Sequence, residues 1–226
     1  MDIEQIRMGF AQIAEKYSMN WKLVDSSKKP RMALLASHES HCLMDLLHRW
    51  HSKELNCEIP CIIANHPQMK QFADWHSIPF HWIDFKTLGK EAAFAQISQL
   101  IKQYNIDLTV LARFMQILPD TLCKELAGRA INIHHSFLPS FAGAKPYQQA
   151  YDRGVKLIGA TCHYVTSDLD EGPIIEQEVM RISHSDSAQD MVRKGKNCEK
   201  TALANGVRYH LEDRVIIHHS KTVVFA

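Results

Sequence analysis

The 226-residue chain has almost no net charge, +1 at pH 7, and it has no long apolar run. A balanced charge gives no electrostatic sign of a nucleic-acid or membrane partner. No segment approaches the roughly 20 apolar residues that a bilayer-spanning helix needs. The N-terminal stretch MDIEQIRMGF also lacks the apolar block of a signal peptide. We therefore expect a cytoplasmic protein that binds neither nucleic acid nor membrane.

The six cysteines show no paired CxxC spacing. They are expected to be reduced thiols of a cytosolic protein, not a disulfide framework or a zinc ribbon. Fourteen histidines are present, and four of them fall close together: His38, His41, His48 and His51. Imidazole is a common metal ligand, but no cysteine or acidic residue accompanies these four at a recognisable metal spacing. The sequence predicts no metal, and a metal-binding module stays a minor alternative.

Glycine-rich phosphate motifs are absent, because the chain contains neither GxGxxG nor GxxxxGK[ST]. The first predicted strand leads instead into SHESHC (37–42), which has no glycine. A backbone cradle for phosphate needs glycines for close approach. A nucleotide-binding Rossmann domain is therefore disfavoured, although a sheet of that general kind is still expected.

Apolar segments typical of strands alternate with segments of helical period along most of the chain. Strands are predicted at 31–37, 58–66, 80–85, 107–114 and 129–136, and helices at 42–55, 68–76, 90–104 and 119–128. Such alternation implies a parallel sheet that helices cover on both faces. The predicted fold class is α/β, with an open, mostly parallel, Rossmann-like sheet.

The two ends of the chain depart from this pattern. Apolar residues at intervals of three and four predict an amphipathic helix over residues 3–17. The later part predicts strands at 155–166 and 172–182, a helix at 187–213 and a strand at 215–225. We expect residues 1–30 to form a helix and connector, and residues 31–226 to form one domain. The first helix and the last strand are candidate contacts of a homo-oligomer.

The stretch INIHHSFLPSF (131–141) carries the first candidate site. Asn132 and His134 lie at the carboxyl end of a predicted strand, whose two-residue period places both on one face. Ligands of open α/β sheets bind at such ends. An amide donor beside an imidazole suits a carbonyl that becomes an oxyanion, with the apolar segment 137–141 as a wall. The same pattern also occurs by chance on core or surface strands.

The stretch HYVTSDLDEGPII (163–175) carries the second candidate site. His163 lies on a predicted strand, and Asp170 follows seven residues later in a turn marked by glycine and proline. A carboxylate at that position can hold a water molecule or orient His134. A solvated turn aspartate is the plainer interpretation of Asp170 taken alone.

Together with LARFMQILP (111–119), these motifs resemble the formyltransferase family that uses 10-formyltetrahydrofolate. The resemblance implies the formyltransferase fold and a catalytic set of Asn132, His134 and Asp170, with His163 in support. It also implies that the pterin lies against two loops, mostly through backbone contacts, although FMQIL is also compatible with plain core. The residues of these loops are Phe114, Met115, Gln116, Ile117, Leu118, Thr166, Ser167, Asp168 and Leu169.

Longer stretches narrow the resemblance. SHESHCLMDLLHRW, GAKPYQQAYDRGVKLIGATCHYVT and RKGKNCEKTALANGVRYHLEDRV resemble formyltetrahydrofolate deformylases, which hydrolyse 10-formyltetrahydrofolate to tetrahydrofolate and formate. Glycinamide ribonucleotide formyltransferases carry a glycine-rich loop after the first strand and methionyl-tRNA formyltransferases an RGAAP-like stretch, and this chain has neither. The resemblance implies a hydrolase that feeds formate to purine biosynthesis and one-carbon balance. Its partner would be the folate substrate, with no other cofactor.

The implied reaction is attack of water on the formyl carbon. The glycine-free loop fits this reaction, since a hydrolase needs no anion grip for an acceptor. Two alternatives remain open: transfer of the formyl group to an unidentified amine, and folate binding without catalysis. Deformylases usually begin with an ACT-type regulatory domain, whereas this chain starts at the helix that would follow it. The chain is either truncated or a naturally short member, which leaves regulation by that route open.

Overall fold

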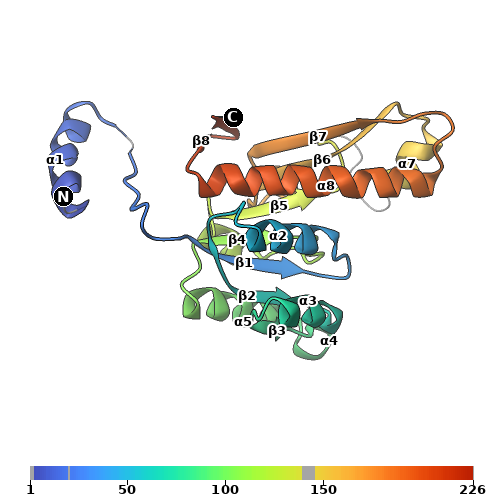
Figure 1. The fold of residues 1–226 in the computed structure, drawn as a ribbon, viewed down its shortest axis with the longest axis horizontal. Helices are drawn as coiled ribbons and strands as arrows, with labels where there is room; N and C mark the ends of the chain where they lie inside the picture. The colour runs from blue at the N-terminus through green and yellow to red at the C-terminus, as the bar shows by residue number, and fades with distance from the viewer. Residues whose placement is uncertain (1–2, 20, 139–145, 226) are drawn as a thin grey trace.

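A seven-stranded sheet forms the centre of the computed structural model, which describes residues 3–19, 21–138 and 146–225 (Figure 1). Its strands are β1 Arg31–Ala36, β2 Glu58–Ala64, β3 Phe80–Trp82, β4 Leu108–Leu111, β5 Ala130–His134, β6 Leu157–Tyr164 and β7 Ile174–Arg181. They lie in the order β3-β2-β1-β4-β5-β6-β7. Neighbours from β3 to β5 pair in parallel, and β6 and β7 extend one edge antiparallel. The predicted open, mostly parallel sheet is confirmed.

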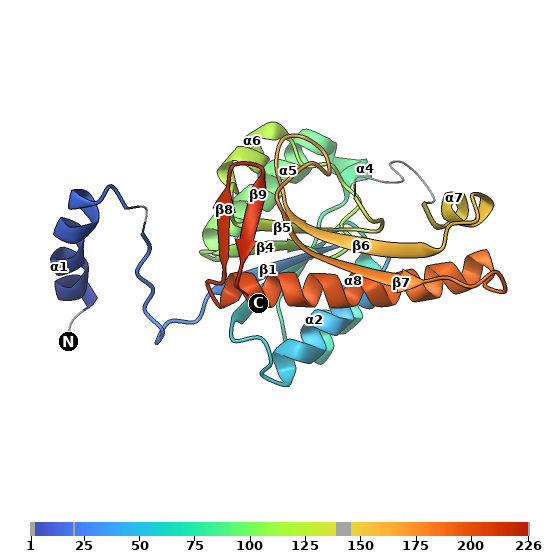
Figure 2. The same cartoon turned by 90° about the horizontal axis from the view of Figure 1, so that it is seen from above.

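Helices cover both faces of this sheet, as the sequence predicts. On one face lie α2 (His41–His51) and α8 (Ala188–Leu211), and on the other lie α5 (Lys90–Gln103) and α6 (Asp120–Glu125) (Figure 2). The shorter helices are η1 Pro67–Met69, α3 Lys70–Trp75, α4 Phe85–Leu88 and α7 Pro146–Asp152. The sheet therefore separates two buried cores.

Strand β1 shows why the central strands read as continuous apolar runs. Every residue of β1 after Arg31 is buried. Leu34 joins the core beneath α2 and α8, while its neighbour Leu35 joins the core beneath α5 and α6. Burying one leucine side chain contributes roughly 1.5–3 kcal/mol. A strand with both faces buried therefore has no polar face to reveal its period.

Helix α8 begins with a strong capping signal. The Ser187 hydroxyl accepts a hydrogen bond from the backbone N–H of Asp190, and the Asp190 carboxylate accepts one from the backbone N–H of Ser187. This reciprocal capping box satisfies two backbone donors at the helix start. The helix packs against β6, β7 and α2, and it carries the fully buried Glu199 toward the carboxyl end of the sheet.

The single strand predicted at 215–225 is wrong. β8 (Val215–His218) and β9 (Lys221–Val224) form a separate antiparallel hairpin instead. The chain reverses at His219, which adopts a left-handed φ of +53°. No glycine or proline marks this turn, so its residue types do not predict it.

Two shorter segments also differ from prediction. The strand predicted at 80–85 ends at Trp82, because Asp84 caps α4 by accepting from the backbone N–H of Lys86. The helix α7 was not predicted. The side chain of its Tyr147 is buried, and its importance for the site is described below.

The predicted N-terminal amphipathic helix is present as α1 (Ile3–Lys16). It lies apart from the sheet, at the end of an extended connector (Figures 1 and 2). Its apolar stripe is exposed, including Ile6, Phe10 and Ile13. Within the described residues, no helix combines the length and apolar character needed to cross a membrane.

Candidate active site

Strand β5 positions the two polar residues of INIHHSFLPSF at the carboxyl end of the sheet. Ile131 and Ile133 pack into the core beneath α2 and α8. Asn132 and His134 therefore face the opposite side, as the alternation predicts. His134 is buried, with 7% of its surface exposed. Of the predicted apolar wall, residues 139–141 lie outside the described part of the chain.

The antiparallel strand β6 and the turn that follows it bring Asp170 back to β5. Asn132 pairs with His163 across the two strands. Asp170 adopts a left-handed φ of +58° in the turn. Gly172 lies so close to β6 that a Cβ at this position would stand 1.7 Å from the Tyr164 carbonyl oxygen. The glycine thus allows the turn to pack onto the strand with Asp170 beside β5.

Four polar side chains meet at this edge: Asn132, His134, His163 and Asp170, which we call the Asp170 group. His134 Nδ1 lies 3.1 Å from Asp170 Oδ2, and His163 Nε2 lies 3.7 Å from Asp170 Oδ1. Asn132 Nδ2 lies 3.2 Å from His163 Nε2. The structure therefore brings together all four residues of the predicted catalytic set.

Hydrogen bonds indicate the proton positions in the Asp170 group. His163 Nδ1 donates to the Tyr164 carbonyl oxygen at 2.9 Å, and its Nε2 accepts from the Asn132 amide. This bond orients the amide and leaves its second N–H for another acceptor. His134 Nδ1 faces an acceptor-only carboxylate and so carries a proton. His134 Nε2 is buried and has no hydrogen-bond partner among the described residues, so it is the atom available to a ligand.

Asp170 is held in its ionised form. The hydrogen bond from His134, and then the neighbouring His163, lower the pKa of its carboxyl far below the ordinary value, against the opposing effect of burial. A carboxylate that stays ionised orients an imidazole or a water molecule well. The arrangement combines a hydrogen-bonding amide, an imidazole and a fixed negative charge, which suits attack on a carbonyl group.

One cleft contains the Asp170 group and both predicted pterin loops. Phe114 and Leu118 are buried and serve as core, whereas Met115 and Ile117 are 56% and 66% exposed. The Ser37 hydroxyl accepts from the Met115 backbone N–H at 2.8 Å, which holds this loop against the end of β1. The other predicted loop residues that line the cleft are Gln116, Thr166, Ser167, Asp168 and Leu169. Pterin binding by these residues stays a prediction.

A second buried polar cluster adjoins this cleft, and the sequence analysis missed it. We call it the Glu199 group: His41, Arg113, Tyr147 and Glu199. The Tyr147 hydroxyl donates to Glu199 Oε1 at 2.7 Å, and His41 Nε2 lies 2.7 Å from Oε2. Arg113 Nε lies 3.2 Å from the same Oε2. Both carboxylate oxygens therefore have partners. The four residues come from four separate segments, so no spacing in the sequence links them.

The environment of Glu199 keeps this buried carboxyl ionised. Burial opposes ionisation, but the His41 hydrogen bond, the Arg113 charge and the Tyr147 hydroxyl outweigh it, and the Glu199 pKa lies below its ordinary value. Burial and the neighbouring carboxylate raise the pKa of Tyr147, whose hydroxyl stays a donor. Gly195 of α8 makes room for this tyrosine, since a Cβ there would stand 2.1 Å from the ring.

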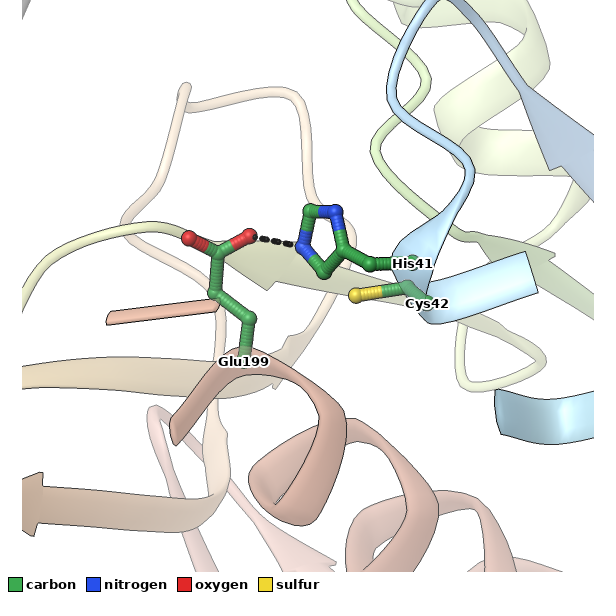
Figure 3. A group of neighbouring side chains, drawn as sticks. All are labelled: His41, Cys42 and Glu199. Atoms are coloured by element: carbon green, nitrogen blue, oxygen red, sulfur yellow. Dashed lines mark hydrogen bonds and ion pairs between the residues drawn. The ribbon is translucent and has the colours of Figure 1, made fainter. Parts of the chain in front are cut away.

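Three potential metal ligands lie near one another at His41, Cys42 and Glu199, with ligand atoms within 4.8 Å (Figure 3). The other histidines of the 38–51 region are not part of this group. The cationic Arg113 already contacts the Glu199 carboxylate and would repel a metal ion. Burial, with the nearby Glu199, raises the pKa of the Cys42 thiol well above its ordinary value, which disfavours a thiolate ligand. This donor set does not fit a metal ion.

Comparisons with known proteins agree with this fold and cleft. The family model for formyl transferases matches residues 30–207. A formyltetrahydrofolate deformylase of Synechocystis sp. is 48% identical over 222 residues, which cover 98% of this chain and 78% of that protein. The crystal structure of a formyltetrahydrofolate deformylase from Pseudomonas syringae pv. tomato is 57% identical, with a TM-score of 0.97 over 100% of this chain and 76% of that one.

A phosphoribosylglycinamide formyltransferase from Anaplasma phagocytophilum shares the fold at lower similarity. It is 30% identical, with a TM-score of 0.80 over 88% of this chain and 96% of that one. The matches define the class: this chain belongs to the formyl transferase family. Within the family it is more similar to the two deformylases than to this formyltransferase, which confirms the resemblance seen in the sequence.

Proposed function

We propose that this chain hydrolyses 10-formyltetrahydrofolate to tetrahydrofolate and formate. The observation that carries the proposal is the Asp170 group, where an oriented amide and the unpartnered His134 Nε2 lie beside an ionised carboxylate in one cleft. The similarity to formyltetrahydrofolate deformylases supports the identity of the substrate.

In this proposal the formyl oxygen lies between Asn132 and His134. The second N–H of Asn132 Nδ2 and a proton on His134 Nε2 both donate to the oxygen as it becomes an oxyanion. The Asp170 carboxylate, 3.1 Å from His134 Nδ1, stabilises the positive charge of the imidazolium ring. A preorganised donor of this kind contributes roughly 2.7–4 kcal/mol to transition-state stabilisation.

Asp170 has a second role, which is to orient the attacking water. The water oxygen bonds to the formyl carbon while a water proton moves toward Asp170. The depressed pKa of Asp170 means that this carboxyl passes the proton on and does not keep it. The proton reaches N10 through His134 and bridging water as the C–N10 bond breaks. Formate and tetrahydrofolate result, and no cofactor beyond the substrate is consumed.

The pterin ring would lie against the loops 114–118 and 166–169. Both loops line the cleft beside the Asp170 group. The loop after β4 is fixed by the hydrogen bond from the Met115 backbone to Ser37, so its remaining backbone groups are presented in a defined geometry. We expect backbone contacts to orient the pterin, as the family resemblance implies.

Turnover in amine-free buffer is the direct test. The purified chain is incubated with 10-formyltetrahydrofolate, and formate and tetrahydrofolate are quantified in parallel. We expect equal amounts of the two products and no change on addition of an amine. An absolute requirement for an amine would establish the transferase alternative, and binding without turnover would establish a non-catalytic folate-binding protein.

We also propose that the enzyme acts in the cytoplasm as a homo-oligomer and supplies formate to purine biosynthesis. Exposed apolar side chains on α1, such as Ile6 and Ile13, and on the hairpin, such as Ile216 and Val223, support self-association. Light scattering of the purified chain would test it. We expect a mass above that of one chain, which Ile13→Asp lowers, and a monomer at all concentrations would contradict the assembly.

A further inference from the structure

The fold of this chain is shared by an enzyme named for a ribonucleotide acceptor, so some feature must make water the acceptor here. An amine is a stronger nucleophile than water and would compete if it reached the formyl carbon. The question rests on the proposed hydrolysis. The structural answer must lie in what occupies the space next to the Asp170 group.

The Glu199 group occupies that space. Arg113 and His135 both line the cleft together with Asn132 and His134. The His134 and His135 rings lie 5.2 Å apart, and the His135 and Tyr147 rings lie 6.3 Å apart. Tyr147 in turn donates to Glu199. A row of neighbouring protein groups therefore runs from the reactive imidazole to the buried carboxylate.

The Glu199 carboxylate at the end of this row has both oxygens engaged by protein groups. Glu199 is 1% exposed, and its two oxygens are taken by His41, Arg113 and Tyr147. An incoming ammonium or amine would need such a carboxylate as its partner. Arg113 holds that position permanently and presents like charge to a cationic amine.

Two backbone features show that placing Arg113 and Tyr147 here carries a conformational free-energy cost. Arg113 adopts a left-handed φ of +64°, a conformation that glycine adopts far more readily than arginine. Gly195 lies inside α8, where an alanine would favour the helix, but a Cβ there would meet the Tyr147 ring at 2.1 Å. Both costs come from placing residues of the Glu199 group, which lies next to the Asp170 group.

We propose that the Glu199 group is a specificity element that excludes amine acceptors, with Arg113 as the residue that closes the amine path. Removal of the Arg113 side chain would open a pocket that ends at the Glu199 carboxylate. Such a pocket would suit a primary amine that enters as a cation. In the formyl transfer so permitted, the ammonium group first loses one proton to water. The neutral amine nitrogen then bonds to the formyl carbon, the C–N10 bond breaks and a second amine proton goes to N10. Electrons and protons balance without a further reactant.

The test compares product partition in Arg113→Gly and in the unaltered chain. Each is incubated with 10-formyltetrahydrofolate and glycinamide, and formate and formylglycinamide are quantified by mass spectrometry against an enzyme-free blank. The unaltered chain should give formate alone at every glycinamide concentration. Arg113→Gly should raise the ratio of formylglycinamide to formate by roughly tenfold or more above the blank.

Lys53→Gly is the matched control. Lys53 is also a cation at left-handed φ, +65°, but it is exposed after α2 and does not line the cleft. Its replacement should leave both the hydrolysis rate and the product ratio unchanged. A rise in the ratio with this control as well would overturn the assignment to Arg113.

Arg113→Asn provides a second variant that keeps the Glu199 carboxylate, because asparagine is neutral, shorter than arginine and tolerates the left-handed φ of this position. If either variant folds by circular dichroism and still hydrolyses substrate with an unchanged product ratio, the proposal is wrong. If neither folds, the group is part of the scaffold and not a removable barrier, which also overturns the proposal. Absence of formate from the unaltered chain without amine would instead reject the proposed hydrolysis, so the two failures are distinguishable.

Discussion

The Asp170 group and the Glu199 group are two solutions to holding a carboxylate among histidines at one edge of a sheet. The Asp170 side chain is 25% exposed, in an open cleft, whereas the Glu199 side chain is 1% exposed. Each group leaves a buried nitrogen without a hydrogen-bond partner among the described residues: His134 Nε2 in the Asp170 group, and His41 Nδ1 and Arg113 Nε in the Glu199 group. In the Glu199 group, both carboxylate oxygens are engaged.

The exposure of the carboxylate separates the reactive polar cluster from the structural one in this protein. A carboxylate with all its partners supplied by the protein has little left to offer a ligand. By this criterion the Asp170 group performs the chemistry, and the Glu199 group shapes its surroundings.

Asp170→Asn should have the largest effect. The change removes the charge that stabilises the His134 imidazolium and orients water, so hydrolysis should fall by roughly 10²–10⁴-fold. The measurement is kcat for formate release, with folate binding measured separately and expected to change little. Glu171→Gln, an exposed neighbour in the same turn, is the matched control and should keep full activity. Equal kcat for Asp170→Asn and the unaltered chain would contradict the assigned role.

Asn132→Ala should have the next largest effect. It removes one oxyanion donor while His163 keeps its bond to the Tyr164 carbonyl. We expect a fall of roughly 10²–10³ in kcat with a smaller change in KM. Loss of affinity with unchanged kcat would show that Asn132 binds the substrate and does not stabilise the transition state.

His135 lies between the Asp170 group and the Glu199 group, and its pKa predicts how stability depends on pH. Burial, with the charges of Arg113 and His134, lowers the pKa of His135 to about 4. Since the unfolded value is about 6.5, the unfolded chain binds more protons between these values. Keeping the His135 ring neutral has no free-energy cost above pH 6.5. The free energy of unfolding falls as the pH drops from 6.5 toward 4. His135→Gln should reduce this acid-induced loss by an amount on the order of 1–3 kcal/mol.

Denaturant unfolding at a series of pH values checks the His135 prediction. The free energy of unfolding of both proteins should fall on acidification, since His210 also has a pKa lowered by burial to about 4. The fall should be shallower in His135→Gln. Parallel curves would show that His135 is not held neutral between the two groups.

Metal removal should have the smallest effect, which is none. The Glu199 carboxylate already has protein partners, and the buried Cys42 thiol stays protonated. Dialysis against a chelator should leave both kcat and the unfolding midpoint unchanged. Loss of either property, restored by a divalent cation, would mean that His41, Cys42 and Glu199 hold a metal ion after all.

The sequence predicted the Asp170 group well for a physical reason. The strand period alone puts Asn132 and His134 on one face, and the family resemblance supplied Asp170 from the turn after β6. The Glu199 group was unpredictable, since His41 and Glu199 are 158 residues apart and meet only when α2 packs beside α8. The C-terminal hairpin was missed because its turn at His219 uses a left-handed residue with no glycine signal.

Turnover in H₂¹⁸O shows whether water is the nucleophile that attacks the formyl carbon in this cleft. We predict that formate released by the chain in amine-free buffer carries one oxygen from the solvent, and that Asp170→Asn releases this labelled formate far more slowly. Tetrahydrofolate formation that yields no labelled formate, or a rate that is indifferent to residue 170, would contradict the account.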